Sequence, residues 1–259
     1  MIHELRLFFI ALQFLTRVPV PAWVGFEPDW LNQSARHFPA AGLFVGGVAA
    51  LALWAGHGLF APAVAVGLSM VATLLLTGGF HEDGWADTCD GLGGAVSRER
   101  ALAIMKDSRI GAYGAMGLVM MLGLKAATLA SMPLAWAMPA LLLAHTASRV
   151  AAVVLIRTLP YAGDAEHAKA KPLARTVSSA GVAVALAWGV ALALGLWAWQ
   201  PLWAAAIGVS LLAVAAGTLG CRRWLRRRLG GTTGDTLGAT QQITELLALL
   251  GWLAALRWA

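Results

Sequence analysis

An acidic stretch over residues 79–94 contains the side chains of this chain that are best suited to chemistry. Four carboxylates fall within nine of its residues: Glu82, Asp83, Asp87 and Asp90. On a helix the three aspartates occupy positions i, i+4 and i+7, so like charges share one face and repel one another. No Lys or Arg lies between Arg36 and Arg98, so the counter-charge comes from a distant segment or from a bound divalent cation. Oxygen ligands favour Mg²⁺ or Mn²⁺; a solvated acidic helix face is the alternative.

A second polar group, Lys106-Asp107-Ser108-Arg109, follows the acidic stretch. Lys106 and Arg109 are the cations nearest in sequence after Arg98 and Arg100, and side chains of this kind neutralise phosphate oxygens. Asp107 is either a further metal ligand or the ion-pair partner of these cations. The group therefore indicates a site for a phosphate ester beside the metal.

A glycine-rich segment, Gly230-Gly231-Thr232-Thr233-Gly234-Asp235, precedes the last apolar stretch. Backbone N–H groups in such loops and at helix starts bind phosphate, which makes Gly234 and Asp235 candidate substrate contacts. No Gly-Lys-Ser/Thr follows, so the segment is not a P-loop. The alternative is a flexible turn in which Asp235 or Thr236 caps the next helix.

The composition places these residues in a membrane protein. Hydrophobic residues make up 59% of the chain and charged residues 12%, and the mean hydropathy is +0.71, outside the range of soluble globular proteins. We predict an all-α, polytopic fold that forms one integral membrane domain over residues 1–259. It has an N-terminal interfacial or re-entrant segment, 1–38, and about seven transmembrane helices: 39–60, 61–78, 113–131, 134–156, 177–199, 201–220 and about 238–256.

The polar loops predict the orientation of these helices. Three long loops, at about 79–112, 157–176 and 221–237, alternate with short turns, so the long loops share one side of the bilayer. Sixteen of the 19 Lys and Arg residues lie in these loops or in the N-terminal segment. By the positive-inside rule this side is the cytoplasm, and the candidate site faces it. Because the basic residues lie between apolar spans, they indicate a lipid bilayer and not a nucleic acid as the partner.

A few ionisable residues lie within the predicted spans. Glu245 shares a helix face with Gln241, and an ionisable residue inside a span is a functional candidate with a partner. The candidate partners are Lys125, His145 and Arg149. We count Glu245 and Arg149 as substrate-binding candidates; a structural pair between helices is the alternative.

Over most of its length the chain resembles the cobalamin synthase family, also called adenosylcobinamide-GDP ribazoletransferases. The resemblance rests on four blocks: Phe14-Leu15-Thr16-Arg17-Val18-Pro19, His81-Glu82-Asp83-Gly84-Trp85-Ala86-Asp87-Thr88-Cys89-Asp90-Gly91, Ile104-Met105-Lys106-Asp107-Ser108-Arg109-Ile110-Gly111, and Gly234-Asp235-Thr236-Leu237-Gly238-Ala239 before Glu245. It implies an Mg²⁺-dependent transferase of the bacterial inner membrane that joins ribazole, or its 5′-phosphate, to adenosylcobinamide-GDP and releases GMP. This reaction completes the nucleotide loop of cobamides.

The resemblance also implies roles for the residues above. Glu82, Asp83, Asp87, Asp90 and Asp107 would hold the metal, and Lys106 and Arg109 would offset charge on the leaving GMP. Asp90 or Asp87 would take the proton from the attacking hydroxyl, which makes Asp83, Asp87, Asp90 and Lys106 the catalytic set. The corrinoid nucleotide and ribazole are the partners, and a homo-oligomer is left open.

Two other functions compete with this one. The first is a CDP-alcohol phosphotransferase-like membrane enzyme, because Asp83-Gly84 precedes Ala86; the Arg of that signature is missing and the spacing of its aspartates differs. The second is a divalent-cation transporter. Transporters bind their ions near the bilayer midplane, whereas the acidic residues here lie mostly in loops, which disfavours transport.

Overall fold

The structure is a computed structural model that describes residues 2–94, 97–163 and 173–256. Within these ranges it is a helical bundle with no β-strand, only an isolated bridge between Tyr161 and Thr232. Its helices are α1 (Ile2–Leu15), α2 (Pro28–Ser34), α3 (Phe38–His57), α4 (Pro62–Thr77), α5 (Phe80–Leu92), α6 (Arg98–Met105), α7 (Ala112–Ala130), α8 (Leu134–Thr158), α10 (Ser179–Trp199), α11 (Ala204–Arg228) and α12 (Gly234–Ala255).

The predicted spans correspond to α3, α4, α7, α8, α10, α11 and α12. Among the described residues, five helical stretches are long and apolar enough to cross a membrane: Pro28–His57, Ala112–Ala130, Leu134–Thr158, Ser179–Trp199 and Pro201–Arg228. The bent pair α4 and α5 makes a sixth if it is taken as one span. α12 has 22 residues, enough for a span, but it carries buried polar side chains and lies against α8 and α11. The all-α, polytopic membrane fold is confirmed.

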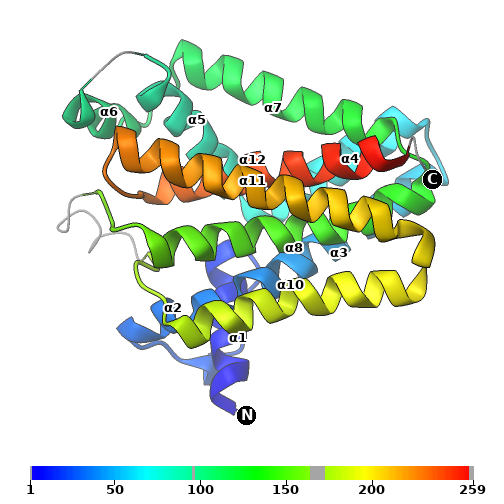
Figure 1. Ribbon diagram of the computed structural model, residues 1–259, viewed down its shortest axis with the longest axis horizontal. Helices are drawn as coiled ribbons and strands as arrows, with labels where there is room; N and C mark the ends of the chain where they lie inside the picture. The colour runs from blue at the N-terminus through cyan, green and yellow to red at the C-terminus, as the bar shows by residue number, and fades with distance from the viewer. Residues whose placement is uncertain (1, 95–96, 164–172, 257–259) are drawn as a thin grey trace.

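α8 lies at the centre of this bundle (Figure 1), where it contacts α3, α10, α11 and α12. Small residues let α3 approach α8 closely. A Cβ atom added at Gly42 would lie 2.3 Å from the backbone oxygen of His145, and one at Gly46 would lie 3.0 Å from that of Leu141. Close helix contact through glycine is the usual packing in membranes, where lipid competes for apolar surfaces. This contact holds His145 and Arg149 inside the bundle.

The junction of α4 and α5 is sharply bent. The two helices meet at 90°, and Gly78 and Gly79 between them have φ angles of +71° and +72°, which residues with a Cβ rarely adopt. A Cβ atom on Gly78 would also lie 2.4 Å from Nε of Arg17. The stretch after residue 79, predicted as a loop, therefore contains two helices, α5 and α6, because the glycine pair allows the chain to turn and begin a new helix at once.

The long connections gather at one end of the bundle and the short turns at the other (Figure 1). α6 and the segments before α10 and α12 lie at the first end, whereas the turns that follow α3, α7 and α10 lie at the second. α1 runs across the direction of the long helices, as an interfacial helix does. The arrangement agrees with the predicted alternation of long loops and short turns.

Candidate functional site

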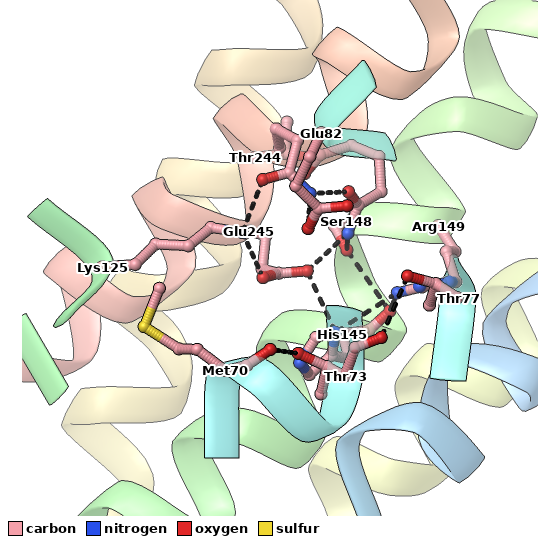
Figure 2. A network of polar contacts seen from close by, with 12 residues as sticks. Met70, Thr73, Thr77, Glu82, Lys125, His145, Ser148, Arg149, Thr244 and Glu245 are labelled. Atoms are coloured by element: carbon pink, nitrogen blue, oxygen red, sulfur yellow. Dashed lines mark hydrogen bonds and ion pairs between the residues drawn. The ribbon is translucent and has the colours of Figure 1, made fainter. Parts of the chain in front are cut away.

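Ionisable side chains from three helices meet inside the bundle (Figure 2). Nζ of Lys125, on α7, lies 2.6 Å from Oε1 of Glu245, on α12, and both side chains are 6% exposed. The other carboxylate oxygen of Glu245 lies 3.0 Å from Nδ1 of His145, on α8. Buried charges need partners of this kind, because an unpaired charge inside an apolar bundle costs several kcal/mol, roughly. The predicted partnership of Glu245 with Lys125 and His145 is therefore present.

Two neighbouring glutamines extend this cluster to α5. Gln241 donates hydrogen bonds to Oγ of Ser148, at 3.1 Å, and to Glu245. Gln242 accepts from Nζ of Lys125 at 2.6 Å and donates to Oε1 of Glu82 at 3.2 Å. The side chain of Glu82 therefore points into the bundle, away from the aspartates of its own helix. We call Glu82, Lys125, His145, Arg149, Gln241, Gln242 and Glu245 the buried polar cluster.

Two atoms of the buried polar cluster have no hydrogen-bond partner among the described residues. They are Oε2 of Glu82 and Nε of Arg149, and both are buried. Arg149 is only 2% exposed; its Nη1 donates to the backbone oxygen of His145 at 2.8 Å. Six further buried polar atoms of the described residues also lack a partner, so these two atoms mark hydrogen-bonding capacity that a water or a ligand can use and do not by themselves indicate a ligand.

A cavity of about 420 Å³ lies between the buried polar cluster and the helices α4 and α7. The cluster forms one side of it, and apolar residues such as Val71, Leu74, Leu122 and Leu129 form much of the rest. Volumes of about 300–1,000 Å³ with a few convergent polar groups are typical of small-molecule sites. Arg149 also borders a second, narrow cavity of about 30 Å³ that includes Gly234.

The aspartates of α5 do not enter this cavity, and they differ among themselves. Asp83 is exposed and Asp87 is half-buried, one helical turn further on. Both carboxylate oxygens of Asp90 accept backbone N–H groups at the start of α7, from Gly111 at 2.7 Å and from Gly114 at 2.8 Å. A Cβ atom at Gly111 would lie 2.4 Å from Oδ1 of Asp90, so any other residue there would displace this carboxylate. Asp90 is thus the anchor of the N-terminus of α7.

The acidic helix crosses the start of α12 at a glycine. A Cβ atom on Gly84 would lie 2.8 Å from the backbone oxygen of Asp235, and one on Gly238 would lie 3.3 Å from that of His81. The first turn of α12 carries a capping box between Thr233 and Thr236. Gly84 therefore brings Asp83 and Asp87 next to the N-terminus of α12, where Gly234 and Asp235 lie.

The segment between α6 and α7 holds the predicted cations. The guanidinium of Arg109 donates to Asp107, with Nη2 2.7 Å from Oδ2 and Nε 3.0 Å from Oδ1. Hydrogen bonds from the Arg109 side chain and backbone lower the pKa of Asp107 to about 2. Of the two predicted roles of Asp107, the structure favours the ion-pair partner. Lys106 is exposed in the same segment.

The structure places the five predicted metal ligands in different surroundings. Among the residues that the structure describes, no three His, Cys, Asp or Glu side chains lie close enough to hold one ion. Glu82 turns inward, Asp90 anchors α7 and Asp107 pairs with Arg109. Asp83 and Asp87 lie one turn apart on the same side of α5. Two carboxylates fit Mg²⁺ that is also held by substrate phosphates, because this ion usually takes only one or two protein carboxylates and keeps several waters.

The predicted substrate contacts also lie in two separate places. Gly234 and Asp235 lie at the start of α12, whereas Glu245 is ten residues further along this helix, about 15 Å at 1.5 Å per residue. Arg149 and Glu245 belong to the buried polar cluster, next to the large cavity. Gln242 lines this cavity, and Ser148 accepts a hydrogen bond from Gln241, which also lines it; neither was predicted as a site residue. The signal for Gln242 was its place beside Gln241 and one turn before Glu245; an isolated serine in a span gives no such signal.

Replacing Asp90 with Ala is expected to destabilise the protein by about 2–4 kcal/mol, because two charge-assisted hydrogen bonds to the start of α7 are lost. Asp90→Asn should retain part of the stability, since its single amide oxygen can accept only one of the two N–H groups. Thermal unfolding of the purified protein in detergent measures both changes. If Asn proves as damaging as Ala to turnover while stability is kept, Asp90 acts on the substrate or the metal instead.

Comparisons with known proteins extend this description. The chain matches the family model of cobalamin-5-phosphate synthase over residues 7–253. It is 59% identical to the adenosylcobinamide-GDP ribazoletransferase of Leptothrix cholodnii, over 98% of this chain and 97% of that protein. The proteins of the same name from Polaromonas naphthalenivorans and Vibrio cholerae are 45% and 44% identical, over 99% and 98% of this chain and 100% and 96% of theirs. No solved structure matches the chain.

Proposed function

The chain belongs to the cobalamin-5-phosphate synthase family, and from this membership we propose that it joins ribazole, or its 5′-phosphate, to adenosylcobinamide-GDP and releases GMP. In this reaction a ribose hydroxyl oxygen forms a bond to the phosphorus that carries the cobinamide arm. The bond from this phosphorus to the oxygen shared with GMP breaks, so GMP leaves with that oxygen. The hydroxyl proton passes to a carboxylate of the protein.

We place the reaction at the contact between Gly84 and Asp235, and this contact is the main support for the proposal. It brings the carboxylates of α5 to the N-terminus of α12, at a distance that only glycine allows. A helix N-terminus presents backbone N–H groups and a partial positive charge to a phosphate. A diphosphate bound there would lie next to Asp83 and Asp87.

Asp83 and Asp87 would hold Mg²⁺ at this junction. When bound, the ion would offset the charge of the diphosphate oxygens and make the phosphorus easier to attack. Asp235, in the first turn of α12, is a third carboxylate close to this pair, because its backbone lies against Gly84. The protein would supply few ligands and leave the others to substrate and water, as is usual for this ion.

Lys106 and Arg109 would stabilise the leaving GMP. Asp90 ties the segment that contains them to α5, since it accepts hydrogen bonds from Gly111 and Gly114. This makes Asp90 a positioning residue that keeps the cations beside the diphosphate. Both oxygens of Asp90 accept these N–H groups, and Asp87, one turn earlier on the same helix, is the other candidate for the group that accepts the hydroxyl proton.

Turnover by the purified protein tests this function. We expect detergent-purified protein supplied with adenosylcobinamide-GDP, ribazole and Mg²⁺ to release one GMP for each cobamide formed, both measured by chromatography. EDTA should abolish turnover, and Mg²⁺ should restore it. Absence of GMP and cobamide would reject the proposal. Metal-dependent release of CMP from a CDP-alcohol, or cation flux into liposomes without turnover, would favour the competing functions.

We further propose that the end of the bundle with the long connections faces the cytoplasm of a bacterial inner membrane, because most Lys and Arg residues lie at this end. Ser97 and Ser131 are exposed at opposite ends of the bundle. In a variant lacking Cys89 and Cys221, a membrane-impermeant maleimide should label Ser131→Cys in spheroplasts. Ser97→Cys should react only after the membrane is permeabilised. The reverse pattern would overturn the orientation.

A further inference from the structure

The cavity of about 420 Å³, which is partly open to the surface of the bundle, has two unlike parts. One is formed by the buried polar cluster, and the other by apolar side chains of α4, α7 and the neighbouring helices. Water alone would suit the first part but leave the second in contact with apolar groups only. A molecule with an apolar ring and a polar end fits both parts.

Two side chains that line the polar part, Glu82 and Arg149, each contain a buried atom with unused hydrogen-bonding capacity. Oε2 of Glu82 is an acceptor and Nε of Arg149 is a donor, and neither has a partner among the described residues. A carboxylate oxygen and a guanidinium N–H together suit a ligand hydroxyl, which donates to the first and accepts from the second. The cavity therefore presents a site for a hydroxyl-bearing compound next to an apolar compartment.

We infer that this cavity binds the acceptor nucleoside, ribazole, an inference that rests on the proposed function. Ribazole joins a flat, apolar benzimidazole ring to a ribose with several hydroxyls. A volume of about 420 Å³ is of the size that small ligands occupy, whereas the corrinoid nucleotide, with its macrocycle and GDP, is far too large to enter. The ring lies against Leu74, Leu122 and Leu129, and the ribose lies at Glu82 and Arg149.

This placement also connects the cavity with the proposed site of reaction. Glu82 borders the cavity, and Asp83, the next residue, is exposed at the junction with α12. Their Cα atoms are about 3.8 Å apart, as for any neighbours in a trans chain. The cavity and the proposed site of reaction therefore adjoin the same turn of α5, with Glu82 at the first and Asp83 at the second.

A substitution that fills the cavity tests the inference. Gly123 lines the cavity, and a Cβ atom added there meets no atom within 4 Å. We expect Gly123→Leu to raise the KM for ribazole by about tenfold or more, because the ring would lose its space, with an unchanged KM for adenosylcobinamide-GDP. Gly195→Leu is the matched control: its Cβ is equally free, but Gly195 lies on α10, away from the cavity. It should change neither constant.

Glu82→Gln provides a second test that keeps the shape of the side chain. Loss of the charged acceptor should raise the KM for ribazole about tenfold to a hundredfold. Unchanged KM values for ribazole in both variants, or a rise only for the corrinoid nucleotide, would overturn the inference. These results differ from a failure of the proposed function, in which the unaltered protein itself forms no cobamide from ribazole.

Discussion

Asp83→Asn is expected to lower kcat by about three orders of magnitude while the protein remains folded. Asp83 is exposed on α5, so the substitution opens no cavity in the bundle. It removes one of the two carboxylates that we assign to the metal and halves the negative charge available there. Loss of a group that stabilises charge in the transition state reduces turnover far more than it reduces stability.

GMP release by the purified variant measures this loss, and gel filtration and thermal unfolding in detergent measure folding. Asp29→Asn is the matched control, because Asp29 is an exposed aspartate on α2 that accepts a hydrogen bond from Gln33, outside the site. It should retain full turnover. Activity of Asp83→Asn near that of the control would remove Asp83 from the metal site.

Glu245→Leu should destabilise the protein by about 3–5 kcal/mol, because it leaves Lys125 buried without a counter-charge. His145 would lose its carboxylate partner at the same time. The double variant Lys125→Met/Glu245→Leu should regain much of the loss, since well-packed apolar residues can replace a buried ion pair at little cost. Denaturant or thermal unfolding in detergent measures the unaltered protein, the single variants Lys125→Met and Glu245→Leu, and the double variant.

An exposed ion pair is the control for this experiment. Glu4 pairs with Arg36 at 3.1 Å, but its side chain is 50% exposed, so Glu4→Gln should cost no more than about 1 kcal/mol. Strictly additive effects of the two single substitutions at Lys125 and Glu245 would contradict the assignment of a coupled pair.

The sequence predicted the class of fold well, because it depends on local properties. Apolar runs of about 20 residues form membrane helices, and their lengths and the turns between them can be read directly from the chain. The spacing of Asp83 and Asp87 likewise places them on one face of a helix wherever that helix lies. The acidic stretch was expected in a loop, and the bend at Gly78 and Gly79 made it a helix instead.

Only the tertiary structure shows that the carboxylates of the acidic stretch have different partners. Asp90 is occupied by N–H groups more than 20 residues later in the chain, and Glu82 by an amide of Gln242, 160 residues away. Contacts over such separations depend on which helices pack together, and the periodicity of a single helix does not specify this. The same applies to the ion pair of Lys125 and Glu245, which are 120 residues apart.

The amino-acid sequence by itself thus determined that the protein is an α-helical membrane protein, which residues are acidic and basic, and which of them share a helix face. The tertiary structure decided that Asp83 and Asp87 meet the start of α12, that Asp90 anchors α7, and that Glu82 lines an internal cavity. The physical reason is that hydrophobic length and helical period are properties of single segments, whereas a cavity or an ion pair forms only between segments.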